Sequence, residues 1–353
     1  MQFLKHFRLV GGRVAKTGIA VFLTALICEL FNWPATFAVI TAIVTIEPTA
    51  TNSIKKAFIR FPASAIGALY AVALSSFFGN RPITYAFVAL LTIITCHKLK
   101  LAPGILVATL TGIAMIPTIH DHYVATFFIR LGTTTIGLIV STVVNIWVLP
   151  PKYSDKITAS IHNLYFKTGN LLERRGSELL QQHSLHRDTR LIFADILQEV
   201  EATDTLCKYQ KEEWKLHRSS RKELRFFHYE YKKLNLLRQI LYHIGNLIYL
   251  PMNRYSYSPD EKERIISAIQ SLKGILHHPA FEIPEQHFIL MKDLLEEFWD
   301  DHEFLRGKQV KHFSCESVLL YELLSIHDLL EELKGIQTLE IHHSSVLEKK
   351  LQT

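Results

Sequence analysis

Six predominantly apolar runs fill the first 150 residues, and they constrain the fold of this chain more than any other feature. They cover residues 14–31, 33–50, 61–79, 82–97, 101–118 and 124–149. Short breaks containing proline, glycine, asparagine or basic residues separate them. A helix that crosses a bilayer needs about 20 apolar residues, and shorter runs still cross by recruiting flanking residues or thinning the bilayer. The sequence therefore predicts an all-α chain whose residues 1–151 form a six-helix membrane bundle.

The charges in this part lie mostly in the breaks between the runs. Residues 1–150 contain 11 Lys and Arg but only three acidic residues, Glu29, Glu47 and Asp121. Alternate breaks carry most of the basic residues: Lys5, Arg8, Arg13 and Lys16, then Lys55, Lys56 and Arg60, then Lys98 and Lys100, then Lys152 and Lys156. The opposite breaks contain only Arg81 and the stretch His120-Asp121-His122. Because basic loops stay in the cytoplasm, the alternation predicts a multi-pass plasma-membrane protein with both termini cytoplasmic.

The third and sixth runs are similar in sequence. The stretch RFPASAIGALYAVAL begins at Arg60 and RLGTTTIGLIVSTVV begins at Arg130. Each carries small residues four apart: Ala63, Gly67 and Ala71 in one, and Thr133, Gly137 and Ser141 in the other. Small residues on one helix face allow helices to approach closely, so we expect these six to pack helices together. The similarity is short, and either internal symmetry or the frequent use of small residues in spans explains it.

Two arginines in or beside the apolar runs are candidates for a substrate pathway. Arg130 lies inside the sixth run. A charge at the centre of a membrane helix costs at least about 2.5–3.5 kcal/mol, and it usually faces the bundle interior or an aqueous cavity. Snorkelling to the membrane surface is the other interpretation. Arg60 lies nearer the edge of its run, and for it the two interpretations stand equally.

Glu47 and Pro48 end the second run near its expected cytoplasmic end. Proline breaks or bends a helix and frees a backbone carbonyl. With Lys16, Lys55, Lys56 and Arg60 nearby in the topology, Glu47 is a candidate for a gating salt bridge or a proton-coupling acid. An interfacial charge at a helix end is the alternative.

The order WPATFAVITAIVTIEPT…SIKKAFIRFPASAIGALYAV, followed by RLGTTTIGLIVSTVVNIWVLPP, resembles the aromatic acid exporter family and its fusaric-acid-resistance relatives. The resemblance covers residues 5–152, and beyond them only size and helical character agree. It implies secondary efflux of organic anions, particularly aromatic carboxylates. Arg60 and Arg130 match the family's motif arginines, and Glu47-Pro48 matches the position that closes the second span. Larger members carry two such membrane halves, so the resemblance also implies a homodimer or higher homo-oligomer for this chain.

Residues 152–335 predict a cytoplasmic helical domain. Apolar residues three or four apart form one stripe from Ile157 to Leu179 and another from Leu224 to Ile248. Ser258-Pro259-Asp260-Glu261 is a capping-box start for a helix through Leu276, and Pro284-Glu285 begins another helix. We expect a last helix to end before Gly335, followed by a loose polar tail at residues 336–353.

No motif in the sequence points to an enzyme. Phosphate-loop, nucleophile-elbow, zinc and dinucleotide motifs are absent, and the four cysteines, Cys28, Cys96, Cys207 and Cys315, lie far apart. No cofactor or metal site is therefore predicted. The basic residues lie in separate loops and predict no nucleic-acid partner. Three functions stand: an exporter of small organic anions, a passive anion channel, and a membrane-anchored helical scaffold or sensor.

Overall fold

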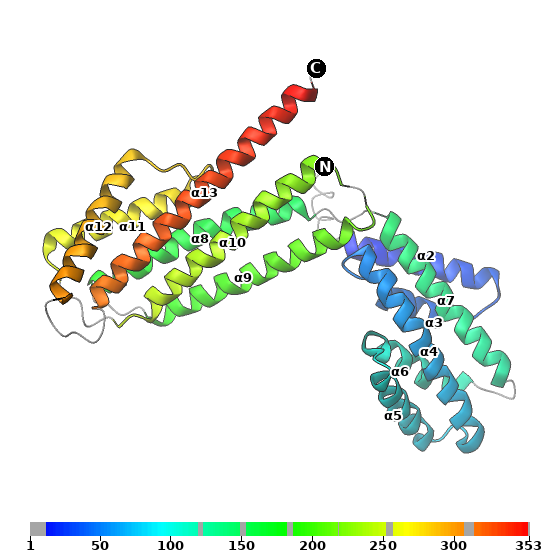
Figure 1. Cartoon of the computed structure of the whole chain (residues 1–353). Coiled ribbons are helices and arrows are strands. Elements are labelled where there is room, and N and C mark those ends of the chain that lie inside the picture. Colours follow the sequence, from blue (N-terminus) through cyan, green and yellow to red (C-terminus); the bar gives the residue numbers. More distant parts are fainter. Residues whose placement is uncertain are drawn as a thin grey trace, which may run out of the picture. The chain divides into compact units, whose positions relative to one another are not determined.

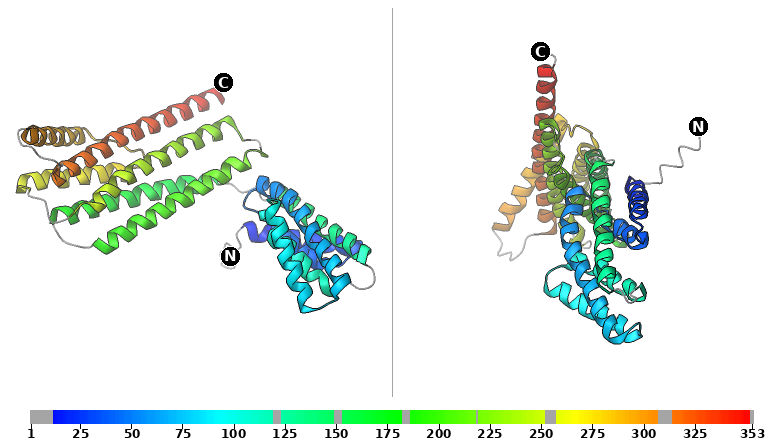
Figure 2. Two further views of the ribbon diagram at one scale, coloured as in Figure 1. Left: turned by 60° about the horizontal axis from the view of Figure 1, so that its bottom comes forward. Right: turned by 90° about the vertical axis from the view of Figure 1, so that its right-hand side faces the viewer.

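The computed structural model describes residues 12–118, 123–148, 153–181, 186–217, 219–251, 257–306 and 314–351. Within these residues every regular element is a helix, which confirms the predicted all-α class. The chain divides into two compact units, and each is described by itself (Figures 1 and 2). The first unit holds residues 1–152 and the short segment 211–218, and the second holds residues 153–210 and 219–353.

The helices of the first unit follow the six apolar runs. They are α2 (Gly12–Leu30), α3 (Ala35–Thr45), α4 (Ala50–Phe78), α5 (Pro82–Lys98), α6 (Ile105–Met115) and α7 (Tyr123–Trp147). Two 3₁₀ turns, Ala102–Gly104 and Ile116–Thr118, flank α6. Among the described helices, α4 and α7 are long and apolar enough to cross a membrane, whereas α3, α5 and α6 are shorter apolar helices. The basic residues Lys5, Arg8 and Lys152 and the stretch 120–122 lie outside the described residues.

Two helix boundaries near Glu47 differ from the prediction. α3 ends at residue 45 instead of 50, because Glu47 precedes Pro48 and a residue before proline avoids the helical region. α4 begins at residue 50 instead of 61, after an N-cap at Thr49 whose hydroxyl accepts a backbone N–H of the first turn. Arg60, expected near the edge of a run, therefore lies inside a continuous helix.

The first unit is built from two related groups of three helices, α2–α4 and α5–α7. α4 packs against α6 as α7 packs against α3, and α5 contacts α4 as α2 contacts α7. Adding 70 to the number maps seven buried residues of α4 onto buried residues of α7: Arg60, Ala63, Ser64, Gly67, Ala68, Ala71 and Ser75 onto Arg130, Thr133, Thr134, Gly137, Leu138, Ser141 and Asn145. The same shift maps Ala38, Thr41, Ala42 and Thr45 of α3 onto Ala108, Thr111, Gly112 and Met115 of α6. The similarity between the third and sixth runs thus corresponds to a repeat in the packing.

The first helix of each group obeys a slightly different shift. Adding 68 maps the four buried residues of α2, which are Lys16, Ala20, Thr24 and Cys28, onto those of α5, which are Thr84, Val88, Thr92 and Cys96. α4 and α7 run antiparallel, since Ser53 near the start of α4 contacts Asn145 near the end of α7 and Ser64 meets Thr134 between them. Because each group has three helices, the two repeats have opposite orientations.

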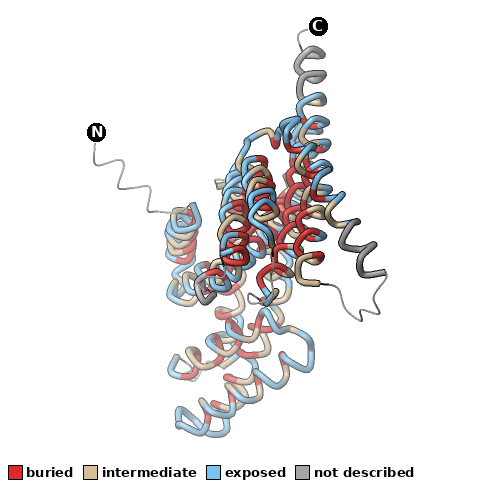
Figure 3. The backbone as a smooth tube through the Cα atoms, turned by 90° about the vertical axis from the view of Figure 1, so that its left-hand side faces the viewer, coloured by how far each residue is buried: buried red, intermediate tan, exposed pale blue. Residues whose placement is uncertain are grey.

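The described helices of the second unit are α8 (Ser154–Gln181), α9 (His186–Glu213), α10 (Arg221–Tyr249), α11 (Pro259–His277), α12 (Glu285–Arg306) and α13 (Cys315–Leu351). The last three residues of α9, 211–213, belong to the first unit. α8 and α10 contain the two predicted stripes, whose apolar residues are buried except for the exposed Leu224 and the partly buried Tyr231. Buried and exposed residues alternate along the helices (Figure 3). α11 begins with the predicted capping box between Ser258 and Glu261, and α12 begins at Glu285 as predicted. No stripe had predicted α9.

The predicted end of the last helix was wrong. α13 continues through Gly335 to Leu351, where a loose tail was expected. A glycine inside a helix costs only about 1 kcal/mol. Beyond it, Ile336 and Glu340 are buried, and Glu340 Oε2 accepts a hydrogen bond from Nζ of Lys233 at 2.6 Å. These contacts outweigh the cost of the glycine.

Candidate functional site

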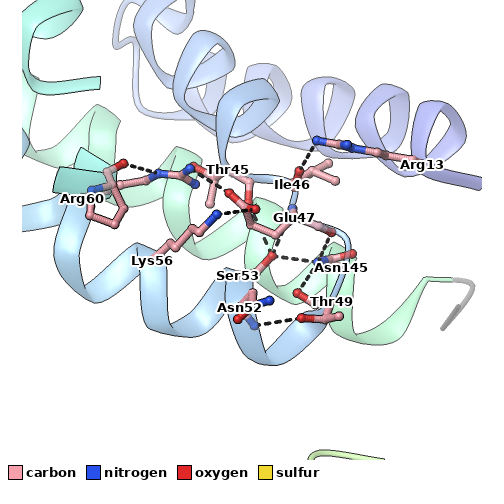
Figure 4. Close-up of polar contacts among 11 residues, drawn as sticks. Arg13, Thr45, Ile46, Glu47, Thr49, Asn52, Ser53, Lys56, Arg60 and Asn145 are labelled. Atoms are coloured by element: carbon pink, nitrogen blue, oxygen red, sulfur yellow. Dashed lines mark hydrogen bonds and ion pairs between the residues drawn. The ribbon is translucent and has the colours of Figure 1, made fainter. Parts of the chain in front are cut away.

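Glu47 lies between two basic side chains of α4 (Figure 4). Its Oε1 accepts a hydrogen bond from Nη2 of Arg60 at 2.8 Å, and its Oε2 accepts one from Nζ of Lys56, also at 2.8 Å. The Glu47 and Arg60 side chains are 10% and 7% exposed, whereas Lys56 is 37% exposed. Removing one partner of a buried ion pair costs about 3–5 kcal/mol, because the other charge stays uncompensated. We call Glu47, Lys56 and Arg60 the Glu47 cluster.

Asn145 of α7 holds the connection between α3 and α4 that carries Glu47 and Pro48. Its Nδ2 donates to the backbone oxygen of Glu47 at 3.1 Å and to Oγ of Ser53 at 2.7 Å (Figure 4). Lys16 of α2, which the sequence analysis placed beside Glu47, donates instead to Oδ1 of Asn145 at 2.9 Å. Three helices therefore fix the position of the Glu47 backbone.

Arg130 is as buried as Arg60 but has no acidic partner among the described residues. Its Nε and Nη1 are buried and make no hydrogen bond. Its Cζ lies 3.8 Å from the centroid of the Phe37 ring in α3, which is a cation–π contact. Buried polar atoms normally have partners, so these two unpaired guanidinium nitrogens mark a place where the acceptor atoms of a ligand fit.

A cavity of about 130 Å³ adjoins Arg130. Apart from Arg130, its lining consists of four pairs of residues that the 70-residue shift relates: Phe37 and Val107, Ile40 and Leu110, Thr41 and Thr111, and Val44 and Ala114. The lining is thus contributed equally by equivalent faces of α3 and α6. The cavity lies at the interface of the two repeats, where transporters built from inverted repeats hold their substrates.

The six small residues predicted to pack helices together are all buried. A Cβ atom added at Gly67 would lie 2.2 Å from the carbonyl oxygen of Ala108, and one added at Gly137 would lie 2.4 Å from that of Ala38. Ala38 and Ala108 are themselves related by the 70-residue shift. The two repeats therefore use the same contact of glycine on backbone, α4 against α6 and α7 against α3.

Three residues of this site were not singled out in the sequence. The sequence could have indicated Asn145, because an amide side chain within an apolar run needs a hydrogen-bond partner. Phe37 and Thr111 had none, because an aromatic residue or a threonine in a span is ordinary until its neighbour is known. In the described part of the chain, no three His, Cys, Asp or Glu side chains are grouped in a way that fits a metal ion.

Comparisons with known proteins show which families this chain resembles. Residues 8–148 match the family model of aromatic acid exporter family member 1. A UPF0421 protein of Bacillus cereus is 46% identical over 340 residues, which cover 95% of this chain and 96% of the relative. UPF0421 proteins of Oceanobacillus iheyensis and Staphylococcus saprophyticus are each 40% identical, over 93% and 90% of this chain and 96% of each relative.

Proposed function

Because the chain belongs to the family of UPF0421 proteins, and its residues 8–148 to the aromatic acid exporter family, we propose that it is a membrane transporter that exports organic carboxylic acids from the cytoplasm. In this proposal α2–α7 are six membrane spans and both termini are cytoplasmic, as the alternation of basic breaks predicts. The substrates are carboxylates with a single aromatic ring.

One observation carries the proposal: the two unpaired guanidinium nitrogens of Arg130 beside an apolar cavity. A carboxylate neutralises the guanidinium charge and accepts hydrogen bonds from its unpaired nitrogens. The adjoining volume of about 130 Å³ is apolar, so it favours a hydrophobic body over a second charge. A cavity of about 150 Å³ in another protein is known to hold benzene, so this one is of the right size for one ring. Phe37 and Ile40 supply the apolar contact.

The short helices α3 and α6 fit the proposed role of forming a substrate site. An eleven-residue helix such as α3 or α6 is about 16 Å long, roughly half of a hydrocarbon core of about 30 Å. Transporters commonly form substrate sites from short or interrupted helices of two inverted repeats. Arg60 and Arg130 each lie one turn from the crossing of Ser64 and Thr134, in opposite directions, and so roughly 6 Å to either side of it. We propose that they line the inner and outer parts of one pathway.

Glu47 acts as the gate at the cytoplasmic end of this pathway, and transport is driven by an ion gradient instead of nucleotide hydrolysis. We also propose a homodimer, because the chain carries one membrane half.

Uptake of labelled benzoate into inside-out vesicles tests the function. We expect accumulation against the concentration gradient that collapses with the pH gradient, and at least a tenfold loss in Arg130→Gln. Arg81→Gln, which removes an exposed arginine before α5, is the matched control and should transport normally. Normal transport by Arg130→Gln in correctly inserted protein would exclude the pathway role of Arg130.

The same vesicles separate the remaining functions. Downhill flux that ignores the pH gradient is the result expected of a passive anion channel. Absence of flux for every aromatic and aliphatic carboxylate would favour a membrane-anchored scaffold or sensor, in which the second unit carries the activity.

A further inference from the structure

Arg60 and Arg130 are equivalent residues in surroundings that differ at one point. Both are buried helix residues at the same position of their repeats. Beside Arg60 stands the carboxylate of Glu47, whereas the position equivalent to Glu47 in the second repeat is Pro117, which has no charge. In Arg60, Nη2 donates to Oε1 of Glu47 at 2.8 Å and Nε donates to the backbone oxygen of Pro103 at 3.4 Å, whereas Nε and Nη1 of Arg130 make no hydrogen bond.

We infer that Glu47 competes with the substrate for Arg60. Its carboxylate occupies the anion-binding position on the Arg60 guanidinium, which we call the Arg60 seat, and this position corresponds to the one on Arg130, the Arg130 seat, where a transported carboxylate binds. This inference rests on the proposed function. The packing of the repeats supports it, because Arg60 and Arg130 are buried at equivalent positions of α4 and α7, while the cavity itself is lined by Arg130 and not by Arg60. Nη1 of Arg60 is buried and unpaired, so this guanidinium also retains an unused donor.

Lys56 makes it feasible for a substrate carboxylate to replace Glu47 on Arg60. Glu47 shares its two oxygens between Arg60 and Lys56, each at 2.8 Å. When a substrate carboxylate binds to the Arg60 guanidinium, Glu47 keeps Lys56 as its counter-ion. Neither carboxylate is then left buried without a partner. Lys56 is the most exposed of the three, so the displaced pair moves toward solvent.

The consequence is that the Arg60 seat is available only to an anion that displaces Glu47. A seat that is free in a fraction of molecules binds its ligand more weakly by that same fraction. If Glu47 leaves Arg60 free in one molecule out of ten or fewer, its removal strengthens carboxylate binding about tenfold or more. The Arg130 seat has no such competitor among the described residues.

Equilibrium binding of labelled benzoate to the full chain in lipid nanodiscs tests the inference. Arg130→Gln should lose most of the binding. Glu47→Gln keeps the shape of the side chain and removes its charge, and it should restore binding to the Arg130→Gln chain through Arg60. Adding Arg60→Gln as a third change should abolish the restored binding. Glu47→Asp, whose carboxylate is one methylene short of Arg60, serves if the glutamine variant does not fold, and it should act in the same direction.

The outcomes separate this inference from the proposed function. Wild-type binding that is lost in Arg130→Gln and not restored by either Glu47 variant overturns the competitor role and leaves the function standing. Wild-type binding that persists in Arg130→Gln but disappears in Arg60→Gln overturns the assignment of an occupied Arg60 seat. Absence of benzoate binding in every chain, including Glu47→Gln, overturns both the function and the competitor.

Discussion

Ser64 and Thr134 meet with their hydroxyl oxygens 3.3 Å apart, and they occupy the same position in the two three-helix repeats. A contact between equivalent residues lies on the axis that relates the repeats. α4 and α7 cross there in opposite directions, and the cavity beside Arg130 is lined by equivalent residues of α3 and α6. The polar residues that break the symmetry, above all Glu47 and Lys16, gather at one end of the unit.

The close contacts of Gly67 and Gly137 predict that one added methyl group at either position lowers the stability of the fold. Gly67→Ala and Gly137→Ala each force a Cβ against a backbone carbonyl, which has no freedom to rotate away, so each should destabilise the fold by about 1–3 kcal/mol. Gly18→Ala adds the same methyl group on an exposed face of α2 with nothing within 4 Å, and it should be neutral or stabilising. Thermal unfolding of the purified protein in detergent measures all three variants. Equal midpoints would show that the helices do not approach as closely as described.

The sequence predicted the helices of the first unit better than their contacts. Apolar runs and breaks located all six, because burial and helix formation leave a direct pattern in residue type. The small residues around Gly67 and Gly137 also pointed to the repeat. The sequence left four basic residues as candidate partners of Glu47 and could not choose among them. Lys56 and Arg60 are the partners in the structure, and the packing of α7 places Lys16 against Asn145 instead. The length of α4 was missed because its first turns carry basic residues that look like a loop.

The orientation of the spans predicts which breaks are reachable from outside. Asn80, before α5, should lie on the outer side, and Lys100, before α6, should lie in the cytoplasm. Both side chains are exposed, so a cysteine at either position should react with a maleimide that cannot cross membranes. Intact cells should label Asn80→Cys and leave Lys100→Cys unlabelled, and inside-out vesicles should give the reverse. The unmodified chain, whose Cys28, Cys96 and Cys207 are buried, supplies the background. Labelling of both positions from one side would rule out the six-span arrangement.

A buried histidine in the second unit predicts a loss of stability in acid. Burial, and secondarily the charge of His327, lower the pKa of His287 from 6.5 to about 4. His287 Nδ1 contacts Oγ of Ser271 at 2.8 Å, and its Nε2 contacts Nδ1 of His327 at 3.1 Å. Between pH 6.5 and 4 the unfolded chain therefore binds one more proton here than the folded chain. Stability falls as the pH falls through this window, by about 2 kcal/mol between pH 7 and pH 5.

Thermal unfolding at a series of pH values checks this expectation. His287→Gln cannot titrate and should flatten the decrease between pH 7 and pH 5, although it lowers the midpoint at pH 7. His278→Gln, which changes an exposed histidine after α11, should keep the wild-type slope. A wild-type slope in His287→Gln would mean that another group is responsible.

The contact of segment 211–218 with α4 predicts that the stability of the first unit depends on a single carboxylate. Glu213 at the end of α9 accepts a hydrogen bond from the backbone N–H of Ala50 at 2.7 Å, at the N-terminus of α4. A carboxylate at this end of a helix pairs with an unsatisfied donor and with the positive end of the helix dipole. Glu213→Ala should therefore destabilise the first unit by about 1–2 kcal/mol and loosen the start of α4, which carries Lys56. Glu201→Gln, an exposed position on the same helix, is the control. The thermal midpoint should fall by several degrees in Glu213→Ala alone, and benzoate uptake should fall with it. Equal midpoints in the two variants would show that α4 does not depend on this cap.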